Sequence, residues 1–428
     1  MPGKYHRILK TLGPGILFAS TCIGVSHLVQ STRAGAVYGF SLLLVVVLAN
    51  IFKYPFFEFA SRYTNATGKS IIDGYFTKGR WILLLYFLIT LPSMFVVTAA
   101  VTFVTSGLLA NLIPIQASTD LWTAIILLVC VVVLALGRYR FLDQLLKVVG
   151  VVLLLSTLTA FFSVLLHGRA EPIQEFIPPR VLDPAGIIFL IALMGWMPTA
   201  VDISTWISLW AEAKIKESGF HPTLRESSID FNFGYWASAF LAICFLTLGS
   251  YIIYGTGIEL SNSSPKFAEQ LINMFTTAIG KWSYYVIALA ALCTMFSTSI
   301  TVVDGYARAV TRTISLLFNF REQGNRLPFI SITIVLGIGT YLVVSQYLNN
   351  LKQLVDLATI VSFVIAPLAG YLNYYVIFSQ EIKPEYRPPL WLKNLALMGL
   401  VFLTIFTFIF VWVKIDPEGI TSFIDSFM

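Results

Sequence analysis

The stretch Ser20-Thr-Cys-Ile-Gly-Val-Ser-His-Leu-Val-Gln-Ser31 interrupts an apolar segment with a glycine, several hydroxyls and a histidine. Inside a bilayer, unwound backbone is tolerated only where it is buried in protein or lines a cavity. A later apolar segment carries a second interruption, Met194-Gly195-Trp196-Met197-Pro198-Thr199, in which proline and glycine both disfavour a helix. Matched interruptions predict a binding site between two broken helices. Close helix packing is the alternative for either glycine taken alone.

Both interruptions lie in a strongly apolar chain. Of its 428 residues, 57% are hydrophobic and 12% are charged, and the mean hydropathy is +0.80. Soluble domains carry about 25% charged residues, so the composition predicts an all-α integral membrane protein. A crossing needs about 20 apolar residues, and we find eleven such stretches: 12–33, 38–60, 81–109, 121–137, 146–167, 185–210, 231–254, 283–303, 327–347, 353–378 and 391–414.

The loop from Leu166 to Pro184 divides the first ten stretches into two groups of five. We therefore predict one transmembrane transporter domain over residues 1–428. Its first repeat covers 12–167, its second, inverted repeat covers 185–378, and an extra peripheral helix covers 391–414.

Basic residues predict the orientation. With a cytoplasmic N-terminus, 20 of the 28 lysines and arginines fall on that side, seven fall on the other, and Lys53 is left inside the second stretch. Lysine and arginine concentrate on the cytoplasmic side of membrane proteins. We expect a protein of the cell membrane with its N-terminus in the cytoplasm and its C-terminus outside.

Several classes of function are disfavoured. We find no basic arm with interleaved aromatic residues, so nucleic-acid binding is not expected. A nucleotide-binding loop and a catalytic constellation are also missing from the sequence, so we expect no cofactor and no enzyme activity. The expected partners are the lipid bilayer and a small ion or small-molecule substrate.

Several motifs resemble those of the Nramp divalent-metal transporters. The first two helices carry the matches Gly13-Pro14-Gly15, Ala34-Gly35-Ala36, Tyr38-Gly39-Phe40-Ser41-Leu42-Leu43, Leu48-Ala49-Asn50 and Thr67-Gly68-Lys69. In the sixth stretch, Met197-Pro198 is similar to the family's Met-Pro-His. The resemblance implies a LeuT-like fold with a metal site between the breaks of helices 1 and 6.

The sequence departs from the family at the residues that carry the chemistry. The family's Asp-Pro-Gly-Asn motif falls on Gly24-Val25-Ser26-His27, so both metal-binding side chains of helix 1 are changed. Thr199 stands where the family has the histidine after Met-Pro. The span 81–109 has no charged residue, although the family has an acidic pair there that it associates with proton movement. We therefore expect family-type proton coupling to be lost.

The groups that remain at the breaks favour a soft ion. Imidazole suits zinc, copper, iron and nickel, and thioethers select softer ions such as Cu(I). We predict substrate contacts at Gly24, His27, Met194, Met197 and Thr199, with His27 and Met197 as metal ligands. Alternatively, the methionines are ordinary apolar lining, and His27 hydrogen-bonds a neighbouring helix.

Asp202 follows the second break by one turn and is our candidate for coupling, with a helix N-cap as its alternative role. Hydroxyls at Thr294, Ser297, Thr298, Ser299 and Thr301, together with carbonyls exposed by the helix 1 break, resemble the sodium site of some transporters of this fold. Alternatively, these hydroxyls bond to their own helix. The substrate stays open between a metal ion and a small organic solute such as an amino acid, with sodium coupling as an option. A scaffold that no longer transports is the third reading.

Overall fold

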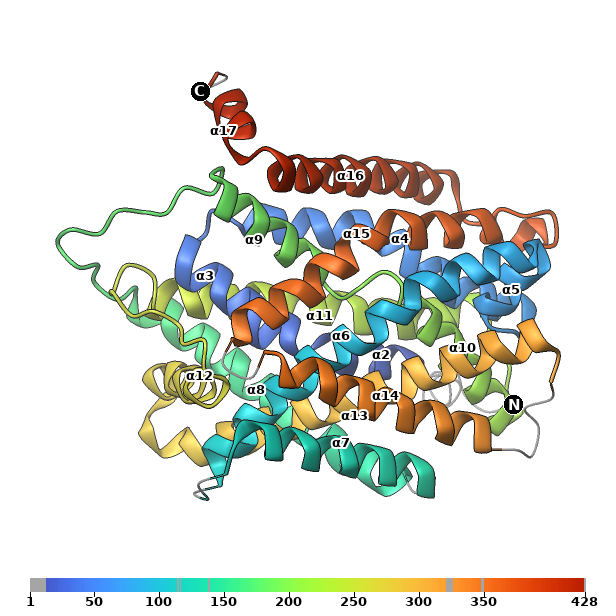
Figure 1. The fold of residues 1–428 in the computed structure, drawn as a ribbon, viewed down its shortest axis with the longest axis horizontal. Coiled ribbons are helices and arrows are strands. Elements are labelled where there is room, and N and C mark those ends of the chain that lie inside the picture. The colour runs from blue at the N-terminus through green and yellow to red at the C-terminus, as the bar shows by residue number, and fades with distance from the viewer. Residues whose placement is uncertain are drawn as a thin grey trace.

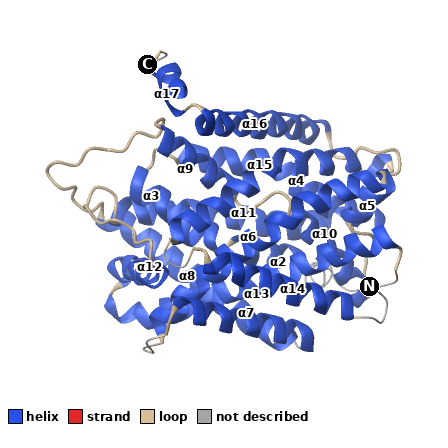
Figure 2. Ribbon diagram, viewed as in Figure 1, coloured by secondary structure: helices blue, strands red, loops and turns tan. Residues whose placement is uncertain are grey.

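The computed structural model describes residues 13–113, 115, 117–137, 139–320, 326–347 and 350–426, without the side chains of 139–150 and 424. This part of the chain is helical and contains no strand, as Figure 2 shows. The predicted all-α architecture is confirmed. Five basic residues that contribute to the predicted orientation lie outside the described residues: Lys4, Arg7, Lys10, Arg138 and Arg321.

Each predicted stretch corresponds to one helix or to one interrupted helix. The first is α2 (Pro14–Cys22), the π-helical turn η1 (Ser26–Ser31) and α3 (Thr32–Tyr38), and the sixth is α9 (Pro184–Gly195) and α10 (Ser204–Ser218). The others are α4 (Leu43–Thr67), α6 (Arg80–Leu112), α7 (Thr119–Leu136), α8 (Tyr139–His167), α11 (Leu224–Ile252), α13 (Tyr284–Phe318), α14 (Leu327–Ser345), α15 (Leu351–Ile377) and α16 (Leu390–Ile415).

Eight helices in the described part of the chain are long and apolar enough to cross a membrane. The interrupted helices and the described part of α8 are shorter, so eleven crossings stay a prediction. Short helices were not predicted, because they lack an apolar run of membrane length: α5 (Ile71–Lys78), α12 (Ser264–Ile279), α17 (Pro417–Asp425) and the turns η2 (Lys281–Ser283) and η3 (Pro384–Tyr386).

The interrupted helices lie inside the bundle. The α2, η1 and α3 segments pack along α11, α2 also contacts α13, and α9 packs against α15. In Figure 1, α16 runs along one edge of the bundle, where it contacts α4, α15 and α9. The predicted peripheral helix is therefore present, and the inner helices converge on the two breaks.

Candidate functional site

The break in helix 1 is short. Regular α-helix ends at Cys22, Ile23 and Gly24 are not helical, and η1 begins at Ser26. The Gly24 amide donates to the Cys22 carbonyl at 2.8 Å, and the Gly24 carbonyl accepts from Leu28 N at 2.9 Å. A Cβ atom at Gly24 would lie 2.9 Å from Cγ2 of Thr298 in α13. Gly24 therefore allows the break to pack directly on α13.

The break in helix 6 is longer and runs from Trp196 to Ile203. The Met197–Pro198 peptide bond in it is cis. Gly195 at the end of α9 lies so close to the Thr359 backbone of α15 that a side chain would collide with it. Trp196 donates its indole N–H to Ser362 Oγ at 2.8 Å, so α15 holds the break on one side.

Lys53, from the middle of α4, holds the helix 6 break on its other side. Its Nζ donates to the carbonyl oxygens of Met194 at 2.9 Å, Gly195 at 2.9 Å and Thr199 at 2.8 Å. The side chain is completely buried. The last carbonyls of a helix have no helical partner, and here one ammonium group satisfies two of them together with one carbonyl from within the break.

Asp202 lies near the end of the same break and is almost completely buried. Ser93 Oγ of α6 donates to Asp202 Oδ2 at 3.0 Å and lies 2.8 Å from the Tyr306 hydroxyl of α13. Asp202 Oδ1 has no hydrogen-bond partner in the described structure. The carboxylate and the Lys53 ammonium also attract each other electrostatically.

His27 lies in η1, just after the break in which we expected it, and it is fully buried. Its Nε2 lies 2.8 Å from the Ser238 carbonyl oxygen of α11, which can only accept, so Nε2 carries a proton. Its Nδ1 lies 2.8 Å from Ser26 Oγ. Both ring nitrogens are thus engaged within the protein, and metal ligation by His27 stays a prediction that requires one of these contacts to open.

A cavity of about 20 Å³ lies between the two breaks. The polar side chains that line it are Thr21 and Ser26 from helix 1, Thr199 from helix 6 and Thr298 from α13. Its walls also include Val97 and Val101 of α6 and Trp196 and Trp206 of helix 6. A space of about 10–15 Å³ already holds one water molecule, so this cavity has the size of a single small ion or water.

Of the five predicted contact residues, only Thr199 lines this cavity. Met194 and Met197 are fully buried in helix 6, and the Met197 sulfur lies 3.8 Å from Ser31 Oγ of η1. Within the described residues, no group of three or more histidine, cysteine, aspartate or glutamate side chains is arranged to hold a metal ion. The predicted ligand set therefore stays a prediction.

Polar contacts close the bundle at both ends of the interrupted helices. Arg33 of α3 donates to Asp356 of α15 at 3.0 Å, and Gln30 joins this pair through a 3.2 Å hydrogen bond to Asp356. Beside them lies a cavity of about 460 Å³ whose lining includes Val29 and Lys352.

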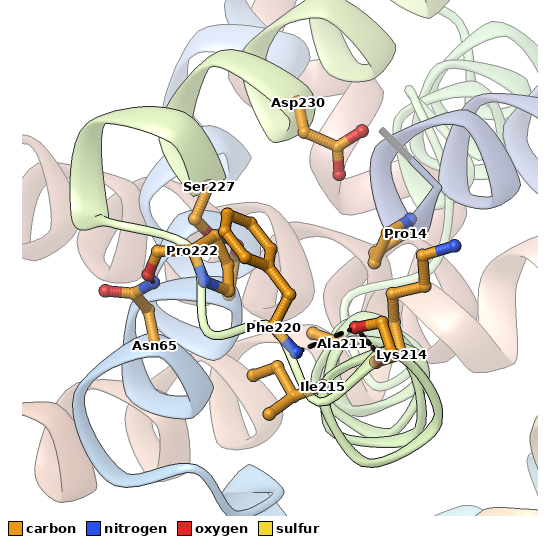
Figure 3. Close-up of a pocket in the computed structure, with 11 residues that line it drawn as sticks. Pro14, Asn65, Ala211, Lys214, Ile215, Phe220, Pro222, Ser227 and Asp230 are labelled. Carbon is orange, nitrogen blue, oxygen red and sulfur yellow. Dashed lines mark hydrogen bonds between the residues drawn. The ribbon is translucent and has the colours of Figure 1, made fainter. Parts of the chain in front are cut away.

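At the other end, Asp230 of α11 accepts hydrogen bonds from the amides of Gly13 at 3.1 Å and Gly15 at 2.7 Å. Figure 3 shows the Asp230 carboxylate beside Pro14 at the start of α2, with Lys214 of α10 nearby. A second cavity of about 20 Å³ lies between these residues. Asp230 thus fixes the free end of the half-helix α2 to α11.

Sequence reasoning missed two of these features. It left Lys53 without a role, although a charge inside an apolar segment is by itself a signal of function. It also did not pair Asp356 with Arg33. That pair could not be found from one sequence, because its members are 323 residues apart and share no motif.

Comparison with known proteins finds relatives that match this chain over nearly its whole length. The chain is 34% identical over 410 residues to the uncharacterized protein PM0681 of Pasteurella multocida, covering 95% of this chain and 93% of that protein. It is 22% identical over 438 residues to the divalent metal cation transporter MntH of Listeria welshimeri, covering 94% of this chain and 89% of that one.

The fold is similar to the crystal structure of the Eremococcus coleocola manganese transporter in complex with an aromatic bis-isothiourea substituted compound. The TM-score is 0.70 at 14% identity, and the match covers 98% of this chain and 93% of that one. The LeuT-like fold with broken helices 1 and 6 is thereby confirmed. Residues 15–413 match the family described as natural resistance-associated macrophage protein-like, and the chain therefore belongs to the Nramp family.

Proposed function

We propose that this protein is a secondary transporter that moves a metal ion across the cell membrane, between the breaks of helices 1 and 6. The observation that carries the proposal is the cavity of about 20 Å³ between the breaks, whose lining includes Ser26, Thr199 and Thr298. In this conformation it has the size of a single small ion or water molecule. Membership of the Nramp family and the MntH relative, a divalent metal cation transporter, support the same substrate class.

The predicted contact residues have unequal support within this proposal. Thr199 faces the cavity. Met194 at the end of α9 and Met197 in the helix 6 break supply two buried thioethers, which suit soft ions, although neither lines the cavity. His27 supports the site through its contact with Ser26 and would become a ligand only after leaving Ser26 or Ser238. Gly24 contributes by leaving room for α13 to pack directly against the helix 1 break.

Asp202 is our proposed coupling residue. Buried polar atoms nearly always have a hydrogen-bond partner, and the bare Oδ1 of Asp202 is an exception within the described structure. It lies at the end of the helix 6 break, where an ion that leaves the cavity toward α10 would pass. After Arg80, α6 has no charged residue, and loss of family-type proton coupling stays a prediction from that observation.

Uptake by proteoliposomes tests the function. We expect saturable uptake of a transition-metal ion such as Zn²⁺ or Fe²⁺ and none of a neutral amino acid. Thr199→Val should lower metal uptake, and Asp202→Asn should change its rate. The matched control is Thr333→Val, because Thr333 is also buried but bonds to its own helix α14. Uptake of amino acids without uptake of metal would overturn the proposal.

A further inference from the structure

Lys53 is placed where a polytopic membrane protein rarely places a charge. It lies within the apolar helix α4, and its side chain is completely buried. Charged residues at membrane depth are costly, and they are retained where they pair with other groups or serve a function. The surroundings of the ammonium group therefore have to compensate its charge.

That compensation comes from backbone carbonyls. An ammonium group has three N–H donors, and Lys53 directs them at three carbonyl oxygens, those of Met194, Gly195 and Thr199, at 2.8–2.9 Å. Two of these carbonyls belong to the C-terminal end of α9, where the helix dipole favours a cation. Among the residues that the structure describes, no carboxylate lies in ion-pair contact with Lys53, and Asp202 acts on it only electrostatically.

A group of carbonyl oxygens without a carboxylate suits a single positive charge. Dications in proteins are held by carboxylates among their oxygen ligands, because an uncompensated buried charge is strongly unfavourable. The three-carbonyl group at the helix 6 break is therefore matched to a monovalent cation, and the chain supplies that cation itself.

We infer that the carbonyls of Met194, Gly195 and Thr199 form a monovalent-cation site that Lys53 fills as a tethered ammonium. In the wild type, Lys53 keeps free cations out of this site and holds the two sides of the break together. Removal of the side chain opens the site to a free primary ammonium ion. The inference goes beyond the proposed function, because it holds whatever the protein transports.

Chemical rescue tests this assignment. Lys53→Ala removes the equivalent of propylammonium, so we expect the purified variant to melt at a lower temperature than the wild type. Millimolar n-propylammonium chloride should restore most of the lost melting temperature in a saturable way. Choline chloride at the same concentration is the control for salt, because its quaternary ammonium group has no N–H donor.

A second variant separates the effect of the lost charge from the effect of the lost side-chain volume. Lys53→Met fills the same volume without an ammonium group, so it should be destabilised and should not respond to n-propylammonium. The inference is overturned if Lys53→Met melts like the wild type, or if n-propylammonium raises the melting temperature of Lys53→Ala no more than that of the wild type. If Lys53→Ala is not recovered folded, the melting temperature of Lys53→Gln tests the inference instead. It keeps N–H donors without the charge, and wild-type stability of that variant would overturn the inference.

Discussion

Gly24 shows how a single residue determines the shape of the helix 1 break. The sequence resemblance predicts that Gly24 replaces a metal-binding carboxylate of the family. A Cβ atom here would approach Cγ2 of Thr298 to 2.9 Å and its Oγ1 to 3.1 Å. The glycine at residue 24 is therefore coupled to the close approach of the Thr298 side chain of α13. A side chain at residue 24 would require Thr298 or the helix 1 break to shift.

The first prediction tests that coupling. Gly24→Ala should lower the melting temperature, and Thr298→Ser removes the nearest atom while it keeps the hydroxyl that bonds to Ser20 and Thr294. The double variant should therefore lose less stability than the two single losses added together. Contacting residues typically show interaction free energies of about 0.5–3 kcal/mol. The free energy of unfolding is measured by denaturation of the wild type, the two single variants and the double variant. If the losses of the single variants add up to that of the double variant, the packing argument is contradicted.

The second prediction concerns His27. Its two ring nitrogens contact Ser26 and Ser238, so His27→Ala should lower the free energy of unfolding by about 1–3 kcal/mol, the cost of leaving a buried partner unsatisfied. Metal affinity, measured by calorimetry, should change less than in Thr199→Val. His167→Ala is the control, because that histidine is exposed at the end of α8. Lost affinity with unchanged stability would instead make His27 a ligand.

At the scale of elements, α3 and α15 are joined by a polar contact. The Arg33–Asp356 ion pair is largely buried, with side-chain exposures of 9% and 18%, so it is less screened by water than a surface pair. Arg33 lines the cavity of about 460 Å³, together with Val29 of η1. Breaking the ion pair should free α3 from α15.

The third prediction follows from this contact. Val29 lines that cavity but is buried, so Val29→Cys should react slowly with a membrane-impermeant thiol reagent. Adding Asp356→Asn should increase the rate several-fold, with the protein lacking the added cysteine as the baseline. Glu381→Gln breaks an exposed ion pair with Lys78 elsewhere and should leave the rate unchanged. Equal rates with and without Asp356→Asn would show that the ion pair does not close this side.

Much of this element structure could be predicted, because a lipid environment demands long apolar runs. Glycine and proline located the breaks, although the helix 6 break extends to Ile203, beyond the predicted Thr199. The contacts of Lys53 could not be predicted, since its partners are backbone carbonyls 141 to 146 residues away. A backbone carbonyl is present at every residue, so such a site leaves no side-chain pattern in a sequence.

At the scale of the whole molecule, the two ends of the bundle differ. Figure 1 places α5 and α10 at one end and α3, α12 and α17 at the other. The α5 and α10 end carries Lys78, Lys214 and Lys216, which the predicted orientation puts in the cytoplasm. The central cavity lies between the helix breaks, away from both ends. The orientation of the chain in the membrane therefore decides which end of the bundle faces an ion that arrives from outside the cell.

The fourth prediction is that orientation. Because the positive-inside rule places the lysine-rich end in the cytoplasm, alkaline phosphatase fused after Ser426 should be active outside the cell. Green fluorescent protein fused at the same residue should stay dark, because it does not fold when it is exported unfolded. Fusions in the α10–α11 loop at Gly219 should give the opposite pair of results, and fusions in the loop at Gly168 should agree with those at Ser426. A cytoplasmic C-terminus with these internal controls intact would remove the odd number of crossings. With it would go the assignment of α16 as an eleventh crossing, because two groups of five crossings already return the chain to its starting side.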